Sequence, residues 1–220
     1  MNTAAVNTAA TQYVDPRFRR SHDALAEIIL ELSASEPADN ITVRQLADAA
    51  GVSRQTFYRH ATSPVEFLGG LLIEDMLRYA PVLMDALNDP SVTFEDAWRR
   101  LYMGMLDHVS RFAAVYRVMV TTKSAVFGII NDWFVSSGRG FIQAAIASSA
   151  DTRDETWIEL AAQQQAGNVS AVMKTWILGG MKESPEHMVE LFMTLAPPWQ
   201  LARRTETGLL DFPTNRHGHR

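Results

Sequence analysis

Arg54 and Gln55 have the side-chain types that read base edges in the major groove of DNA, and they stand next to each other in the chain. An arginine side chain matches guanine O6 and N7, and a glutamine side chain matches adenine N6 and N7. Both residues, with Thr56 after them, fall at the start of a predicted short helix, where a recognition helix brings side chains to the bases. The pattern therefore predicts base contacts by Arg54, Gln55 and Thr56.

Other side chains nearby suit the phosphate backbone. Tyr58, Arg59 and His60 follow in the same segment. A basic cluster at the start of the first predicted helix, suited to phosphates or the minor groove, is formed by Arg17, Arg19 and Arg20. Residues 1–68 nevertheless hold six Arg and eight acidic residues, a net charge of −2. We therefore expect few phosphate contacts and a weak dependence of DNA affinity on salt.

Two short predicted helices must hold these side chains. Thr42–Gln45 predicts a capping box, in which the first side chain caps the helix and the last reaches back to it. Gly51 suits the turn between the helices, Ser53 caps the second helix, and Phe57 anchors it to the core. This arrangement predicts a helix-turn-helix, although the spacing alone also fits a plain helical hairpin.

The remaining sequence predicts further helices. Apolar residues recur at spacings of three and four, and no run alternates with a period of two over the length of a strand. A long helix is predicted at 64–87, with a bend at Pro81. The other helices are predicted at 16–33 and at about 93–109, 111–120, 124–148, 153–178 and 185–196. The expected fold class is all-α.

Composition excludes several classes of protein. The 220 residues include 47% hydrophobic and 20% charged residues, which is the balance of a globular chain and not of a disordered one. Cysteine is absent, which excludes disulfides, zinc–thiolate sites and cysteine nucleophiles. The first 11 residues lack the features of a signal peptide, and no run approaches about 18 apolar residues. We therefore expect a cytoplasmic protein without membrane contact.

Catalytic motifs are also missing from the sequence. It contains no glycine-rich phosphate loop and no nucleophile elbow, and none of its six His forms the two-histidine helix motif of a zinc protease. We expect no catalytic residue, no metal and no cofactor, so the protein is not expected to be an enzyme.

The run from Ile41 to His60, within a longer match over 19–68, resembles the N-terminal domain of TetR-family transcriptional regulators. In that family three helices bind DNA, a fourth leads to a larger ligand-binding domain, and the last two long helices pair across a homodimer. The resemblance implies groove contacts by Ser53, Arg54, Gln55 and Thr56. It implies phosphate contacts by Thr42, Arg44, Tyr58 and His60.

Two positions depart from the family pattern. The family usually has an aromatic residue after the His60 position and a lysine before the linker helix, where this chain has Ala61 and Pro64. The missing lysine removes one expected phosphate contact. The helix N-terminus at Ser63 still offers backbone amides to a phosphate.

The second part of the chain is rich in Met and aromatic side chains, which can line an adaptable apolar cavity or simply fill the core. The resemblance favours a cavity for a small, largely apolar or aromatic ligand. The expected ligand-binding residues are Tyr79, Trp98, Tyr102, Tyr116, Phe127 and Trp133. Four polar residues could hydrogen-bond a ligand, although we favour solvent or a subunit interface for them: Gln163, Gln164, Gln165 and Asn168.

The last two predicted helices could form an apolar outer face that is buried in a homodimer. The residues expected at this interface are Trp176, Met188, Leu191, Phe192 and Leu195. The alternative is that the helix pair packs wholly within one subunit. In a dimer, two recognition helices would read a palindromic operator.

The expected function is that of a homodimeric, ligand-responsive transcriptional regulator. Its partners would be double-stranded DNA and a small-molecule inducer or co-repressor, with a repressor released by an inducer as the favoured case. The expected organisation is a disordered tail at 1–14, a helix-turn-helix domain at 15–68, a ligand-binding and dimerisation domain at 69–202, and a disordered tail at 203–220. The alternative function is a helical dimer that binds a small molecule or protein partner and has lost useful DNA affinity.

Overall fold

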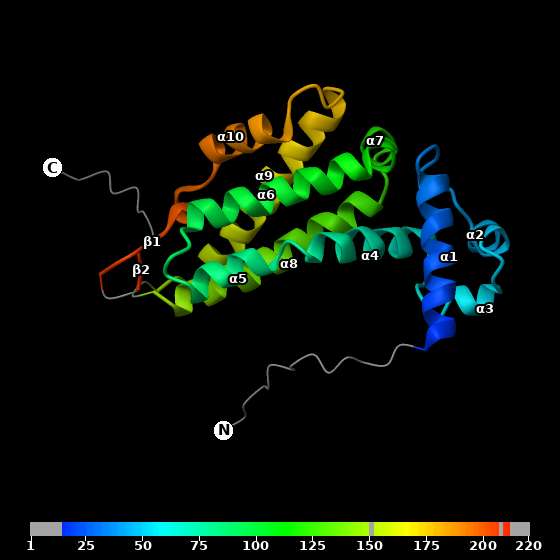
Figure 1. Ribbon diagram of the computed structural model, residues 1–220, viewed down its shortest axis with the longest axis horizontal. Coiled ribbons are helices and arrows are strands. Elements are labelled where there is room, and N and C mark those ends of the chain that lie inside the picture. The colour runs from blue at the N-terminus through cyan, green and yellow to red at the C-terminus, as the bar shows by residue number, and fades with distance from the viewer. Residues whose placement is uncertain (1–14, 150–151, 207–208, 212–220) are drawn as a thin grey trace.

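The computed structural model describes residues 15–149, 152–206 and 209–211, and it confirms the all-α fold class (Figure 1). The first four helices are α1 (Pro16–Ser33), α2 (Val43–Ala49), α3 (Arg54–Phe57) and α4 (Pro64–Leu77). The next six are α5 (Pro81–Asn88), α6 (Phe94–Arg111), α7 (Ala113–Thr122), α8 (Val126–Ala147), α9 (Glu155–Leu178) and α10 (Pro185–Leu195). A short 3-10 helix, η1 (Pro198–Leu201), and two short strands, β1 (Arg203–Arg204) and β2 (Leu210–Asp211), follow.

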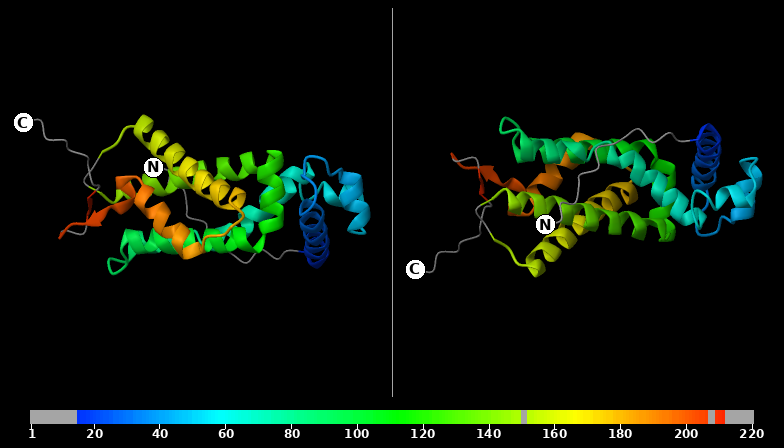
Figure 2. Two further views of the ribbon diagram at one scale, coloured as in Figure 1. Left: turned by 90° about the horizontal axis from the view of Figure 1, so that it is seen from above. Right: turned by 90° about the horizontal axis from the view of Figure 1, so that it is seen from below.

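Helices α1–α3 form one end of the molecule, which we call the head (Figure 2). Leu25, Ile29, Leu46 and Phe57 are fully buried and form the apolar centre of the head. Leu25 and Ile29 lie one turn apart on one face of α1, Leu46 belongs to α2 and Phe57 to α3, so their burial together holds the three helices in place. The helix-turn-helix that they stabilise lies far from α5 and η1 (Figure 1).

Local capping explains where the two short helices of the head begin. The Thr42 hydroxyl accepts the N–H of Gln45 at 3.1 Å, and the Ser53 hydroxyl accepts the N–H of Thr56 at 3.0 Å. Each bond satisfies an amide that the first helical turn leaves free. The side chain of Gln45 does not reach back as the capping box predicts, because it donates to Glu36 instead. Gly51 makes the turn between α2 and α3 with φ +66°, a conformation that glycine adopts without a steric penalty.

The predicted long helix at 64–87 is wrong in one respect, because Pro81 ends it and does not merely bend it. Residues 78–80 form a turn, and α5 begins at the proline. Proline lacks an N–H and clashes with the preceding turn, so an uninterrupted helix would lose a hydrogen bond there. The break lets α4 pack against α8 while α5 packs against α6.

Helices α5–α10 form the larger part of the molecule, which we call the body. Helices α8 and α9 pack against each other along their length, and α10 packs against α6 and α9. Trp98 and Tyr116 are the two largest fully buried side chains of the described residues. Helix α4 runs from the head along the body, so the two parts share one rigid element (Figure 1).

The expected disordered tail at 203–220 needs correction for its described part. Arg203 pairs with Asp211 and Arg204 with Leu210 in an antiparallel ladder, and Leu210 is buried. The Arg204 guanidinium donates to the carbonyls of Ala86 and Leu87 at the end of α5, at 2.8 and 2.6 Å. A cation is favourable at a helix C-terminus, so these bonds fix the segment. The predictions for 1–14 and for 212–220 lie outside the described residues.

Among the described helices, none is by itself both long and apolar enough to cross a bilayer. Helices α7 and α8 reach that length and composition only as a pair, and the chain bends by 102° between them.

Candidate functional site

The residues predicted to face the DNA groove lie on the outer side of the head. Ser53, Arg54 and Gln55 are exposed, and Thr56 is half-buried. The hydroxyls of Ser53 and Thr56 lie 2.9 Å apart, so these two groups complete the cap of α3. Phe57 is fully buried and anchors α3 from below. The arrangement leaves Arg54 and Gln55 as the long side chains with free access to a groove.

The residues predicted to hold phosphates are mostly exposed as well. Tyr58 keeps 59% of its surface, and Arg19, Thr42 and Arg59 are exposed. Arg44 is also exposed, with its Nε 3.7 Å from an Asp48 carboxylate oxygen one turn later in α2. An ion pair of this kind contributes little in water, so it does not prevent a contact with a phosphate.

His60 occupies a different position from the other predicted phosphate ligands. Its ring lies 4.1 Å from the ring of Phe18, and its Nε2 lies 2.8 Å from the Ser21 hydroxyl. Burial, together with the charges of His22 and Arg59, lowers the pKa of His60, which favours the neutral imidazole. The structure therefore places His60 between α1 and the start of α4, as a packing residue of the head.

A hydrogen bond joins the head directly to the body. The Asp39 carboxylate, in the loop between α1 and α2, accepts the N–H of Ala125 at 3.0 Å and also bonds the Ser124 hydroxyl. Ala125 immediately precedes α8, so this contact caps a body helix with a head side chain. Helices α1 and α7 pack together beside it. The head is consequently held at a second point besides α4.

A buried polar network ties α4 to α6 and α7. His108 is fully buried, and its Nδ1 lies 2.7 Å from Asp75 Oδ2 while its Nε2 lies 2.9 Å from the Tyr116 hydroxyl. Arg111 donates to both oxygens of Asp75 at 2.9 Å and to the Tyr79 hydroxyl at 3.1 Å. Every polar atom of the His108 ring thus has a partner, and one carboxylate on α4 receives most of these bonds.

The protonation states of this network follow from burial and from the neighbouring charges. Burial lowers the pKa of His108, so the imidazole is neutral, donates from Nδ1 to Asp75 and accepts from Tyr116 at Nε2. Burial raises the pKa of Tyr116, which keeps its hydroxyl as a donor. Burial would also raise the pKa of Asp75, but the hydrogen bond from His108 and the charges of Arg111 and Arg78 outweigh it and lower the pKa.

These shifts predict a loss of stability in acid. Because the folded state lowers the pKa of His108 below its usual 6.5, the unfolded chain takes up this proton first, and stability falls as the pH drops below about 6.5. Below about pH 4 the lowered pKa of Asp75 adds a second loss in the same direction. Urea unfolding at pH 7.5 and 5.5 measures the effect.

Two histidine variants serve as controls for this prediction. His108→Gln should reduce the dependence between pH 7.5 and 5.5, with a remainder from His60, whose pKa is also lowered. His187→Gln, at an exposed position, is the matched control for the His-to-Gln change itself. An unaltered dependence in His108→Gln would contradict the neutral assignment of the buried imidazole.

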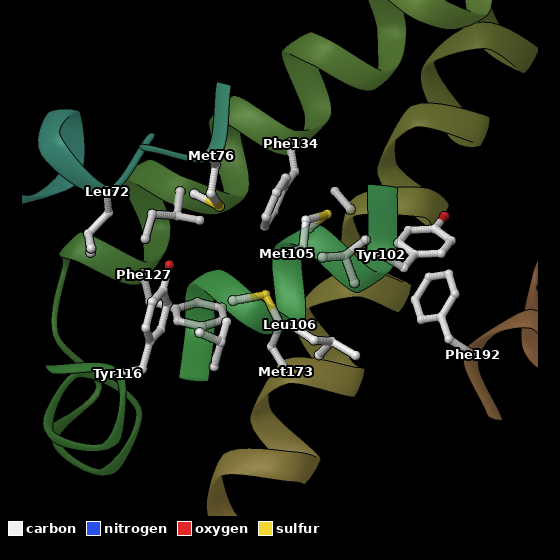
Figure 3. Packing of buried hydrophobic residues seen from close by; sticks show 14 of the residues in the cluster. Leu72, Met76, Tyr102, Met105, Leu106, Tyr116, Phe127, Phe134, Met173 and Phe192 are labelled. Atoms are coloured by element: carbon white, nitrogen blue, oxygen red, sulfur yellow. The ribbon is translucent and has the colours of Figure 1, made fainter. Parts of the chain in front are cut away.

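The body contains an apolar cavity of about 190 Å³ between α4, α5, α6, α8 and α9. Of the six predicted ligand-binding residues, Tyr102 and Trp133 line it. Met76, Met105 and Phe134, which we did not single out as ligand residues, also line it (Figure 3). Methionine and aromatic walls suit an adaptable apolar site, so the type of lining agrees with the prediction.

The other four predicted ligand-binding residues are absent from the lining, which corrects their expected position. Trp98 is fully buried and stacks on Tyr102 with ring centroids 5.5 Å apart. The Tyr79 ring lies against Gly104 on α6. Tyr116 and Phe127 lie together in the core, away from Tyr102 and Phe192 (Figure 3). Trp98, Tyr116 and Phe127 pack the core around the cavity, and Tyr79 is half-buried beside it.

One of the polar residues of α9 also needs correction. Gln163 and Gln164 are exposed and Asn168 is half-buried, in agreement with the favoured solvent or interface position. Gln165 retains only 8% of its surface and lines the cavity. Its Oε1 atom is buried and has no hydrogen-bond partner among the described residues. The solvent interpretation is therefore wrong for Gln165.

Most residues predicted at the dimer interface are buried inside the chain. Trp176 donates from its indole N–H to the Glu183 carbonyl at 2.9 Å, and Met188 is also buried. The Phe192 ring lies 3.9 Å from the ring of Tyr102. By contrast, Leu191 and Leu195 keep 43% and 70% of their surface. The first three residues thus pack within one subunit, and the two leucines are left for an outer contact.

Comparisons with known proteins agree with this geometry. The family model for bacterial regulatory proteins of the tetR family matches residues 29–66, from the last part of α1 to the first turn of α4. The HTH-type transcriptional regulator SrpR of Pseudomonas putida is 23% identical over 190 residues, which cover 84% of this chain and 87% of SrpR. The head therefore resembles the matched segment of tetR-family regulatory proteins, and the chain is similar over most of its length to an HTH-type transcriptional regulator.

Solved structures share the fold of this chain. A TetR-family transcriptional regulator from Syntrophomonas wolfei superposes with a TM-score of 0.61 at 11% identity, over 80% of this chain and 93% of that one. FadR from Bacillus subtilis, solved in complex with stearoyl-CoA, gives 0.54 at 17% identity, over 81% of this chain and 96% of that one. At these identities the likeness concerns the fold.

The matched family and SrpR are transcriptional regulators and not enzymes. Within the part of the chain that the structure describes, no group of three or more His, Asp or Glu residues could hold a metal ion.

Proposed function

We propose that this regulator binds a palindromic operator as a homodimer and is released from it by a small, largely apolar or aromatic molecule. The observation that carries the proposal is the path of α4. Phe67, in its second turn, packs against Phe57 in the head with ring centroids 6.1 Å apart. Met76, near its end, lines the cavity. One helix therefore contacts both the DNA-reading head and the ligand cavity.

The polar network offers a way for the cavity to influence the head. Asp75 is the neighbour of Met76 and accepts the bonds from His108 and Arg111. A ligand that displaces Met76 would move this carboxylate and with it the direction of α4. To shift the population from 1:99 to 99:1, the ligand must bind the released state more tightly by about 5.5 kcal/mol.

The subunit interface is proposed on the outer surface of α9 and α10. Large apolar side chains are exposed there, at Leu160 and Leu178 on α9 and at Leu191 and Leu195 on α10. A second copy would remove this apolar surface from water, which favours association. In this proposal Trp176, Met188 and Phe192 are buried beneath this surface and support it.

The proposed division into domains separates DNA binding from ligand binding. Residues 15–68 form the DNA-binding domain, and 69–202 form the ligand-binding and dimerisation domain, to which the described strands at 203–204 and 210–211 attach. Binding to chromosomal DNA would place the protein in the cytoplasm.

Selection from random duplex DNA by the purified protein, at two salt concentrations, tests the proposal. Enrichment of a palindrome is expected, with a half-site separation of about one helical turn or a multiple of it. Few phosphate contacts should give a shallow salt dependence, in line with the net charge of −2 on residues 1–68. No enrichment at either salt concentration would instead favour a helical dimer that binds a small molecule or protein partner without reading DNA.

Tyr58→Ala is expected to weaken binding to all DNA sequences by a similar factor. The exposed Tyr58 hydroxyl is proposed to donate to a phosphate, which carries no sequence information. Loss of one hydrogen bond of about 1 kcal/mol in each subunit should cost about 30-fold in affinity. Fluorescence anisotropy with the selected duplex and an unrelated one measures both losses. Tyr58→Phe should behave like Tyr58→Ala, and a loss confined to the selected duplex would contradict the phosphate contact.

A further inference from the structure

The cavity contains one polar side chain whose hydrogen bonds are not made. Gln165 is more than nine-tenths buried, lines the cavity, and forms no hydrogen bond with any described residue. A buried amide without partners is costly, and native proteins rarely keep one without a reason. A ligand that reaches this amide would supply one of the missing hydrogen bonds.

Gly138 on α8 determines which end of the Gln165 amide is available. A Cβ at position 138 would lie 2.7 Å from Gln165 Oε1, so the absence of a side chain lets this oxygen sit against the α8 backbone. The oxygen is completely covered there. The amide nitrogen, Nε2, is the end that retains accessible surface. Gln165 can thus offer the cavity a hydrogen-bond donor.

No charged side chain lines the cavity. Its walls are apolar and aromatic, and the lining residues with polar side-chain groups are Gln165, Ser137, Tyr102 and Trp133, the last through its indole N–H. Burial raises the pKa of Tyr102 well above its usual value, and its hydroxyl donates to Gln200 Oε1 at 3.2 Å. An ionised ligand group would find no opposite charge in this lining, which makes a neutral ligand the better match.

The volume restricts the size of the occupant. A cavity of about 150 Å³ in another protein binds benzene, so 190 Å³ accommodates one ring with substituents or two fused rings. Aromatic and methionine side chains around this space suit the flat face of such a ring.

We propose that the ligand is a neutral one- or two-ring compound whose carbonyl oxygen accepts a hydrogen bond from Gln165 Nε2. This inference rests on the proposed ligand-responsive function and assigns its ligand a chemical class. The rings fill the apolar space between Met76, Trp133 and Phe134, and the carbonyl gives Gln165 Nε2 a hydrogen-bond partner.

The test compares two probes of matched shape, 1-tetralone and tetralin, which differ by one carbonyl group. Their dissociation constants are measured by calorimetry with the full-length chain. The wild type is expected to bind 1-tetralone about tenfold more tightly, because tetralin leaves the amide unpaired. Gln165→Met keeps the length of the side chain and removes the amide, so it should bind the two probes equally. Gln163→Met, at an exposed position two residues earlier, should keep the wild-type preference.

Several outcomes would overturn the inference: equal binding of both probes by the wild type, a retained preference in Gln165→Met, or no binding of either probe by a protein that circular dichroism shows to be folded. The selection of duplex DNA is scored separately. A palindrome without carbonyl preference would leave the regulator intact and remove this ligand class. A carbonyl preference without any selected DNA would support this ligand class and contradict the proposed regulator function.

Discussion

Replacing Arg54 with alanine is expected to abolish the preference for one base pair in each half of the operator. The exposed guanidinium stands at the first position of α3, and a bidentate arginine–guanine contact contributes about 1–3 kcal/mol of discrimination. A dimer has two such contacts, so the affinity for the selected palindrome should fall by about 30-fold to 10⁴-fold. Non-specific duplex should bind almost as before.

Arg44→Ala is the matched control for this prediction, because it removes another exposed arginine from the neighbouring helix α2. A phosphate contact at Arg44 predicts a similar loss for all sequences and a salt slope reduced by about one per contact. A repeated selection with Arg54→Ala reads out base preference directly. If Arg54→Ala and Arg44→Ala lose affinity equally for every duplex, Arg54 does not read bases.

Replacing Asp75 with alanine is expected to lower the free energy of unfolding by about 2–3 kcal/mol. The change removes the partner of His108 Nδ1, which is fully buried, and the acceptor for Arg111. A buried donor left without an acceptor loses its hydration without compensation. Urea unfolding at pH 7.5 measures the loss.

Asp85→Ala on α5 is the control, since its exposed side chain should change stability by about 0.5 kcal/mol or less. The double variant Asp75→Ala with His108→Ala should lose less than the sum of the two single variants, because they share one interaction. An additive result, or equal stability of Asp75→Ala and Asp85→Ala, would show that the network does not hold α4 against α6.

The head could be predicted in detail because its signals depend on close neighbours. The Thr42 and Ser53 caps each involve an amide three residues later, and Gly51 provides a backbone conformation of its own. The outward position of Arg54 and Gln55 then follows from the burial of Phe57. Each of these features needs only a few residues of context.

An apolar cavity could be predicted from the sequence, but most of the residues that line it could not. Trp98 and Tyr102 are one turn apart on the buried face of α6, yet only Tyr102 reaches the void. The difference depends on how α8 and α9 pack against α6, and the helical period does not contain this information. The same limitation explains why the sequence predicts Tyr116 and Phe127 at the ligand although neither lines the cavity.

The errors on α9, α10 and the C-terminal segment have a common cause. Helix α9 packs against α7, α8 and α10, so most of its sides are covered, and polarity does not indicate which residues face solvent. Gln165 and Trp176 are buried for this reason. Arg204 is fixed by a carbonyl 118 residues earlier in the chain, a contact that no local pattern reveals.

The central claim is that two copies of α3 read the two halves of one palindrome, and anisotropy titration with two duplexes tests it most directly. One duplex is the selected palindrome, and the other has one half-site scrambled. If two subunits read the operator together, scrambling one half should weaken binding by about a hundredfold or more, since each mismatched base pair costs about 1–3 kcal/mol. Equal affinity for the two duplexes would contradict the account.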